Sequence, residues 1–207
     1  MNNFIILSIL ISIFSFLLYN YIESRRQFVF GYGSLIIDES REKTLHHPST
    51  GYKAYLSSTF NHKRSWTLIK PNYNIELVMK YSFNQKYNTS GIIFQIDPES
   101  LEKIDRRESN YQRIQIPVHM IQSDELKLHS NNKIWIYVRN NEKIIPIVYS
   151  SSDQIDYINR LLNACRNYGK DYMKNFIHTT SGWNLNWLEH RSIHESLLRY
   201  KKYTITE

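Results

Sequence analysis

The sequence is poor in the residues that mark oxidised secreted scaffolds and in the motifs that mark nucleic-acid-binding proteins. Cys165 is the single cysteine among 207 residues, which excludes an internal disulfide and fits a reducing compartment. No zinc finger, helix-turn-helix or RNP strand occurs. The net charge is +7, but lysines and arginines cluster no further than pairs. We therefore interpret most of this charge as solvated surface and expect no nucleic-acid partner.

Charged side chains are also missing from residues 1–22, where "FIILSILISIFSFLL" is an almost unbroken apolar run. About 20 apolar residues in a helix cross the roughly 30 Å hydrocarbon core of a bilayer. Tyr19 and Tyr21 lie where interfacial aromatic residues are expected, and Arg25 and Arg26 follow. A cleavable signal peptide usually carries positive charge before its apolar run and small residues after it. This sequence has neither.

We therefore predict a transmembrane signal-anchor over residues 1–23, through which the protein would contact the membrane. The positive-inside rule places Arg25, Arg26 and the domain that follows them on the cytoplasmic side. A buried helix of the main domain is the alternative interpretation of the apolar run.

The rest of the chain has a mixed pattern of strands and helices. Strand-like runs fall at 28–33, 52–60, 65–69, 75–83 and 90–96, followed by two more in "YQRIQIPVHMI" and "KIWIYVRN". In the last run Ile134, Ile136 and Val138 alternate with Trp135 and Tyr137. The charged, histidine-containing segment 38–49 is predicted to be a loop.

Helices are predicted where capping signals and helical spacing coincide. Asp97 and Pro98 have the N-cap and first-turn chemistry of a helix start. Residues 151–153 cap a second helix, and "GKDYMKNFIHTT" is a third, closing on Trp183 and Trp187. Apolar residues at helical spacing mark the second helix: Ile155, Ile158, Leu161, Leu162 and Cys165. We predict an α+β fold, a small mixed β-barrel of about six strands with flanking C-terminal helices.

The segment "FVFGYGSLI", residues 28–36, places two glycines at the end of a strand. Such a pair usually marks a tight bend or a close backbone approach to a ligand. It lacks the third glycine of a dinucleotide fingerprint, and Ile36 stands where a serine hydrolase elbow needs glycine. A loop directly after a strand can still direct successive N–H groups at an anion such as a carboxylate. A glycine turn without a ligand is the alternative.

A second candidate is "DRRESNY", residues 105–111, at the expected end of the Asp97 helix. Glu108 lies at a position that can direct a side chain into a barrel mouth, although a solvated helix end is the alternative. The spacing of His46, His47 and His62 matches no standard zinc site. We predict no metal site and no cofactor.

Taken in order, "FGYGSLI", "GIIFQI", "LEKIDRRESNYQRI" and "WIYV" resemble the γ-glutamylcyclotransferase superfamily, which includes ChaC-like and AIG2-like members. Its members carry a YGS-type loop after the first strand and, later, a glutamate in a context like D-x-R-E-x-x-Y. In this chain Ser34 and Glu108 are 74 positions apart. The resemblance covers roughly 28–190, which we take as the domain, with 191–207 as a C-terminal tail. Leu35 is followed by isoleucines where ChaC-type proteins usually continue to tryptophan, and the usual soluble members lack an N-terminal anchor.

The resemblance implies an enzyme that cyclises the γ-glutamyl group of an amide to 5-oxoproline. It implies Glu108 as the catalytic proton acceptor and donor. It also implies a substrate-binding set made of the loop and one later tyrosine: Gly31, Tyr32, Gly33, Ser34, Leu35 and Tyr111. The substrate stays open among glutathione, a γ-glutamyl dipeptide and a γ-glutamyl-lysine crosslink.

Two other functions remain compatible with the residues. A non-catalytic, membrane-tethered member would use the same pocket to bind an acidic or γ-glutamyl ligand, or a protein. A basic membrane-surface or nucleic-acid binder rests on net charge alone, and salt-sensitive binding to nucleic acid would favour it. A glutamate at position 108 favours the enzyme.

Overall fold

The computed structural model describes residues 2–69, 74–83, 85–139 and 152–184. The α-helices are α1 (Asn2–Ser24), α2 (Asp38–Leu45), α3 (Pro98–Arg107), α4 (Ser152–Asn167) and α5 (Lys170–Thr179). The strands are β1 (Gln27–Gly31), β2 (Tyr52–Leu56), β3 (His62–Ile69), β4 (Asn74–Tyr81), β5 (Thr89–Ile96), β6 (Gln112–Ile116), β7 (Ile121–Gln122), β8 (Lys133–Val138) and β9 (Thr180–Ser181). Short 3₁₀ turns are η1 (Ser34–Ile36), η2 (Ser58–Phe60) and η3 (Val118–Met120).

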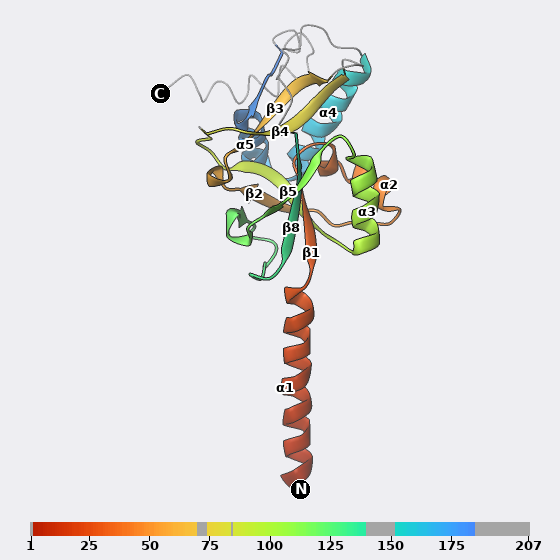
Figure 1. Cartoon of the computed structure of the whole chain (residues 1–207), viewed down its shortest axis with the longest axis vertical. Helices are drawn as coiled ribbons and strands as arrows, with labels where there is room; N and C mark the ends of the chain where they lie inside the picture. Colours follow the sequence, from red (N-terminus) through yellow and green to blue (C-terminus); the bar gives the residue numbers. More distant parts are fainter. Residues whose placement is uncertain (1, 70–73, 84, 140–151, 185–207) are drawn as a thin grey trace.

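The main sheet has six strands in the order β6-β8-β1-β5-β2-β7 and is curled into a half-barrel. β1 lies near its centre, antiparallel to β5 and parallel to β8. Helices α4 and α5 pack together, as do α2 and α3, and Figure 1 shows α2 and α3 at the right of the strands and α5 at the left. The α+β fold with about six strands and flanking helices, predicted from the sequence, is confirmed.

Period-two alternation in the central strands divides the interior into two apolar clusters. Val29 belongs to the cluster that includes α4 and α5, whereas Phe28 and Phe30 belong to the cluster on the other face of the sheet. In β8, Ile134 and Ile136 share the second cluster. Because successive side chains in a strand point to opposite faces, the predicted alternation of β8 places its residues on the two faces as expected.

The hairpin β3–β4 belongs to a second sheet, separate from the six-stranded one. Its order is β4-β3-β9, with β9 parallel to β3. The hydroxyl of Tyr32, just after β1, ties this sheet to the half-barrel: it donates to the carbonyl of Tyr137 at 2.7 Å and accepts from the N–H of Met79 at 3.1 Å. The end of β1 therefore lies where the two sheets meet.

The prediction of a loop over 38–49 is wrong, because residues 38–45 form α2. Asp38 lies in its first turn and Lys43 in its last, as the helix dipole favours. Leu45 enters the core, and the fully buried Arg41 donates to the carbonyl of Leu35 at 3.0 Å. A short polar helix gains its stability from such tertiary contacts rather than from its own pattern, which is why the charged sequence concealed it.

The other predicted helices are present. The Asp97 side chain accepts from the N–H of Ser100 at 2.9 Å, and Pro98 follows it at the start of α3. The five apolar positions predicted for α4 are all buried. Its proposed cap at Ser151, the residue Trp187 and the predicted tail 191–207 lie outside the described residues.

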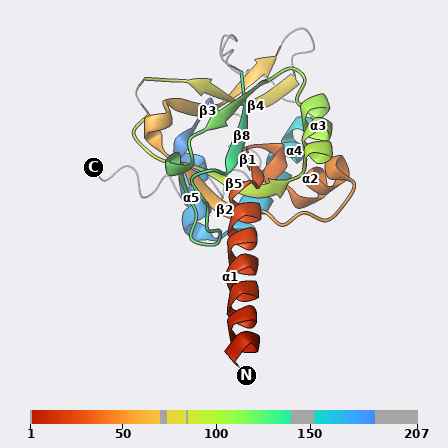
Figure 2. The ribbon, with the colours of Figure 1, turned by 60° about the horizontal axis from the view of Figure 1, so that its bottom comes forward.

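Helix α1 projects from the domain as a single element (Figures 1 and 2). None of its apolar stretch Ile5–Ile22 is buried inside the structure. That contradicts a buried core helix, while a membrane span or a signal sequence each account for an N-terminal apolar helix. Exposed apolar surface of this length is unfavourable in water and favourable in lipid.

Candidate active site

A cavity of about 320 Å³ opens where the end of β1 meets η1, β4, the end of α3 and α4. This is the small end of the range for ligand pockets, about 300–1,000 Å³. Every site residue predicted from the sequence lines it, namely Gly31, Tyr32, Gly33, Ser34, Leu35, Glu108 and Tyr111. Ser34 and Glu108, which are 74 positions apart in the sequence, therefore line the same cavity.

The loop after β1 lines this cavity and contains backbone N–H groups that its own turn does not use. The hydrogen bonds within η1 are donated by Ile36 to Gly33 at 2.9 Å and by Ile37 to Ser34 at 3.2 Å. The N–H groups of Ser34 and Leu35 precede these bonds, so the turn itself does not use them. Successive N–H groups in such a turn form a concave site for an anion the size of a carboxylate.

The two glycines of the loop differ in the space that the structure leaves for a side chain. A Cβ on Gly31 would lie 2.8 Å from the Cβ of Leu35, so close packing excludes a side chain there. A Cβ on Gly33 would lie 3.8 Å from both Leu77 Cβ and the Tyr157 hydroxyl. The φ angle of Gly33 is −132°, so it does not need the left-handed conformation available to glycine. A larger side chain at Gly33 would instead extend among residues that line the cavity.

Glu108 ends α3, where its N–H donates to the carbonyl of Ile104 at 2.8 Å. Its side chain is 16% exposed and lines the cavity. Burial raises the pKa of the Glu108 carboxyl above its ordinary value, the positive charge of Arg107 opposes this rise, and the negative charge of Glu76 adds to it. The net effect is a carboxyl group that holds its proton more readily than an exposed glutamate does.

Arg107 connects Glu108 to the glycine loop and to α2. Its Nε lies 3.1 Å from Glu108 Oε1, and its Nη2 donates to the hydroxyl of Ser34 at 2.8 Å. Its Nη1 donates to the carbonyl of Ser40 at 2.9 Å and to the hydroxyl of Thr44 at 2.6 Å. The Ser34 hydroxyl is thus engaged by the protein.

Other carboxylates of α3 lie elsewhere, as expected from their distance along the helix. Asp105 accepts from the hydroxyl of Tyr137 at 2.7 Å and from Arg113 at 2.6 Å. The Glu102 side chain is 73% exposed. Neither carboxylate lines the cavity.

Several lining residues were not predicted from the sequence. Glu76 enters from β4, Tyr137 from β8 and Tyr157 from α4, and Arg107 and Asn110 flank Glu108. Burial raises the pKa of the Tyr157 hydroxyl above its ordinary value. One signal was present: Glu76 is a lone acid between apolar residues of a strand. In the described ranges, no group of three His, Cys, Asp or Glu residues could hold a metal ion.

Comparison with known proteins assigns the family. Residues 29–155 match the family model "Gamma-glutamyl cyclotransferase, AIG2-like", and the chain belongs to this family. No curated protein sequence matches the chain.

Solved structures resemble its fold. One described as a "Gamma-glutamyl cyclotransferase" has a TM-score of 0.56 at 13% identity, covering 78% of this chain and 92% of its own. An uncharacterised protein from Homo sapiens has a TM-score of 0.55 at 15% identity, covering 73% and 86%. YkqA from Bacillus subtilis has a TM-score of 0.52 at 14% identity, covering 74% and 53%. At these identities the similarity concerns the fold.

Proposed function

We propose that this chain is a γ-glutamylcyclotransferase, which converts a γ-glutamyl amide into 5-oxoproline and a free amine. The substrate would be glutathione or the γ-glutamyl derivative of an amino acid or amine. The observation that carries the proposal is the pairing, in one cavity, of the mostly buried carboxyl of Glu108 with the unused N–H groups of Ser34 and Leu35. Family membership supports the same reaction.

The reaction joins two ends of one substrate. The α-ammonium group loses a proton to Glu108, and the resulting amine attacks the γ-carbonyl carbon to close a five-membered ring. The bond from that carbon to the leaving nitrogen then breaks as Glu108 returns the proton to this nitrogen. The ring nitrogen gives up its second proton to the Glu108 carboxylate, which passes it to the released amine, so the products are a neutral lactam and an ammonium ion. An attack within one molecule has a high effective concentration when the chain is held folded. One carboxyl group serves first as general base and then as general acid.

In this proposal the loop holds the substrate while Glu108 moves the proton. The N–H groups of Ser34 and Leu35 receive the α-carboxylate. Gly31 lets the loop pack closely, and Gly33 leaves space for the γ-glutamyl group. The rings of Tyr32 and Tyr111 form walls of the cavity. The raised pKa of Glu108 suits a group that must both accept and donate a proton.

We also propose that residues 1–23 anchor the enzyme in a membrane, with the catalytic domain, residues 28–190, on the cytoplasmic side. The unburied apolar stretch Ile5–Ile22 supports a span, and Arg25 and Arg26 directly after it support the orientation.

The test is to incubate the full-length protein, in detergent, with a panel of γ-glutamyl compounds and measure 5-oxoproline. We expect Glu108→Gln, which keeps size and hydrogen bonding, to reduce turnover by about 10⁴-fold or more, the upper end for general acid–base catalysis, because both proton transfers use one group. The KM should change little. Glu102→Gln, on the exposed face of the same helix, is the matched control and should retain activity. A loss smaller than about tenfold in Glu108→Gln would move the catalytic role to another residue, and a wild-type protein without 5-oxoproline production across the panel would support a binding protein of the same fold.

A further inference from the structure

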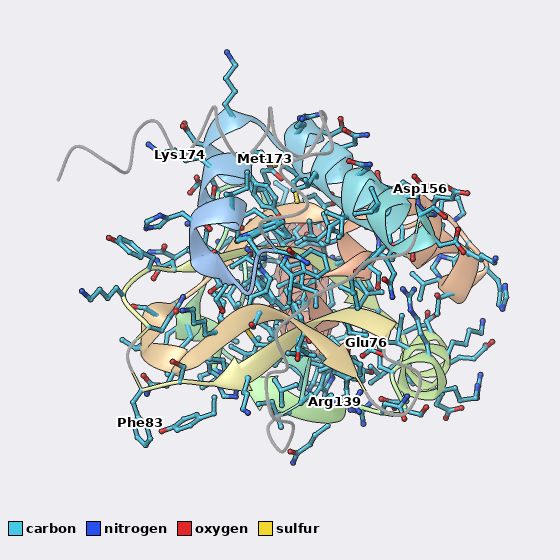
Figure 3. All side chains as sticks on the ribbon, turned by 90° about the horizontal axis from the view of Figure 1, so that it is seen from above. Glu76, Phe83, Arg139, Asp156, Met173 and Lys174 are labelled. Atoms are coloured by element: carbon cyan, nitrogen blue, oxygen red, sulfur yellow. The ribbon has the colours of Figure 1, made fainter. Side chains whose placement is uncertain are left out.

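The cavity contains a second carboxylate, Glu76, to which the proposed reaction assigns no role. Glu76 lies on β4 and its side chain is 29% exposed. Its Oε2 accepts from the Tyr111 hydroxyl at 2.7 Å and from Nη1 of Arg139 at 3.4 Å. Figure 3 views the molecule from the end opposite α1 and labels Glu76 and Arg139 near α3. The carboxylate is therefore held by two donors on one oxygen.

The other oxygen of Glu76 is left for a ligand. In the ranges that the structure describes, neither a hydrogen bond nor an ion pair engages Oε1. An ionised carboxylate has about four acceptor positions, and the two donors use only one side of it. Glu76 and Glu108 line the same cavity.

Tyr111 connects the side chain of Glu76 to the backbone of Glu108. Its backbone N–H donates to the carbonyl of Glu108 at 2.8 Å, and its hydroxyl donates to Glu76. The negative charge of Glu76 also raises the pKa of Glu108, so a cation that reaches Glu108 lies in the field of both groups. Two acids in one cavity with different partners are suited to different tasks: the carboxyl group of Glu108 can exchange a proton, and Glu76, held by two donors, can bind a cation.

We infer that Glu76 binds the α-ammonium group of the substrate, beside the carboxyl group that deprotonates it. This inference rests on the proposed function, and it deepens it by naming the recognised class: γ-glutamyl compounds with a free α-amino group. The loop after β1 receives the α-carboxylate, and Glu76 receives the ammonium. The glutamyl end is then oriented by two charged contacts before any proton moves, which leaves its γ-carbonyl facing the α-nitrogen.

The test separates binding from turnover by using Glu108→Gln protein, in which a γ-glutamyl ligand persists. Isothermal titration calorimetry on the full chain compares γ-L-glutamyl-L-alanine with N-glutaryl-L-alanine, which has hydrogen in place of the α-ammonium group. We expect the ammonium-bearing ligand to bind more tightly by about tenfold or more, as for a charge-assisted hydrogen bond. Adding Glu76→Gln should remove most of this preference and leave the affinity for the glutaryl compound nearly unchanged. Adding Glu102→Gln, the exposed control, should change neither affinity.

Kinetics supply a second readout in protein that retains Glu108. Glu76→Gln should raise the KM by about tenfold or more with a much smaller change in kcat. It should also move the acidic limb of the kcat/KM profile to lower pH, because a charge that raises the pKa of Glu108 is gone. The other charged or titratable groups around Glu108, namely Arg107, Tyr32, Tyr111, Tyr157 and Arg139, are unchanged in this variant.

The outcomes are distinguishable. An equal loss of affinity for both ligands in Glu76→Gln would assign Glu76 a structural role and overturn the inference, as would unchanged affinities or an absence of binding by either ligand. If Glu76→Gln does not fold, Glu76→Asp, which keeps the charge, takes its place. Loss of the preference for the ammonium ligand with retained binding of the glutaryl ligand would then support the inference. An equal loss of affinity for both ligands would overturn it. Preserved ammonium preference in a wild-type protein that makes no 5-oxoproline would reject the proposed reaction and leave the Glu76 site standing.

Discussion

Nε of Arg107 lies 3.1 Å from Oε1 of Glu108, its neighbour in the sequence. The same guanidinium donates to Ser34 in the glycine loop and to Ser40 and Thr44 of α2. The orientation of the proposed proton shuttle and the position of the proposed carboxylate site therefore depend on one side chain. Arg107 also opposes the effect of burial on the pKa of Glu108, so it influences both geometry and protonation.

We expect Arg107→Met to reduce kcat by about tenfold to a hundredfold, because small misplacements of a catalytic group have effects of this size. Arg107 lowers the pKa of Glu108, so its removal raises that pKa and moves the acidic limb of the rate profile to higher pH. The displacement should be a few tenths of a pH unit, since a partly exposed ion pair contributes about 0.2–1 kcal/mol.

Arg106→Met is the matched control, because Arg106 is 69% exposed on the same helix. It should leave both kcat and the profile unchanged. A reduced kcat in Arg107→Met with an unmoved profile would limit Arg107 to a structural role.

The two loop glycines should respond differently to substitution. Gly31→Ala brings a Cβ within 2.8 Å of Leu35 Cβ, and we expect a loss of about 1–3 kcal/mol of unfolding free energy from overpacking. Gly33→Ala has room at 3.8 Å and should fold normally. Gly33→Val should fold but raise the KM, because its branches extend among cavity residues.

Thermal unfolding and steady-state kinetics on the three variants check this. An unchanged KM and kcat in Gly33→Val would show that the loop does not hold the substrate. Equal stability of Gly31→Ala and wild type would contradict the packing argument.

We expect the full-length protein to remain with membranes after alkaline carbonate washing and to be released by detergent. Deleting residues 1–23 should yield a soluble folded domain, because the apolar stretch Ile5–Ile22 has no part buried in it. Arginine at both Ile9 and Ile13 should abolish insertion, since each costs about 2.5–3.5 kcal/mol at a helix centre. Protease protection in sealed vesicles reports the orientation.

Two results would overturn this prediction. Recovery of the full-length protein in the soluble fraction without detergent would exclude an anchor. A mature N-terminus beyond residue 23, found by mass spectrometry, would identify a cleaved signal sequence instead.

Arg64 is a fully buried cation whose removal should destabilise the fold. It donates to the carbonyls of Ser90 at 2.6 Å and Phe176 at 3.0 Å and to the hydroxyl of Thr180 at 2.7 Å. Burial lowers its pKa to about 10, so it stays charged at neutral pH. Each buried acceptor left without a donor costs about 1–3 kcal/mol, and we expect Arg64→Met to lose about 3 kcal/mol or more of unfolding free energy.

Urea denaturation of residues 24–207 measures the change. Lys63→Met, the exposed neighbour on β3, is the control and should stay within about 0.5 kcal/mol of wild type. Similar stability of the two variants would show that the Arg64 contacts contribute little.

The sequence predicted those residues of the candidate site that are neighbours in the chain or belong to a motif of the family. The glycine loop and Glu108 were assigned in this way, and the structure brings them into one cavity. Glu76 and Tyr157 lie in segments that carry no motif, and their local sequence does not indicate that their side chains line the same cavity as Glu108. Tyr32 was predicted to bind substrate, yet its hydroxyl is used between the two sheets and only its ring is available to the cavity.

By itself the sequence determined the features that depend on nearby residues: the apolar helix α1, the Asp97 cap, the alternation of β8 and the buried stripe of α4. Their signals are spacing and capping, which act within a few residues. Only the tertiary structure decided that residues 38–45 form a helix, that β3 and β4 make a second sheet, and that Glu76 lies beside Glu108. These outcomes depend on contacts between residues far apart in the chain, such as the link from Tyr111 to Glu76. No local pattern encodes them, because their free energy exists only once the packed partners are in place.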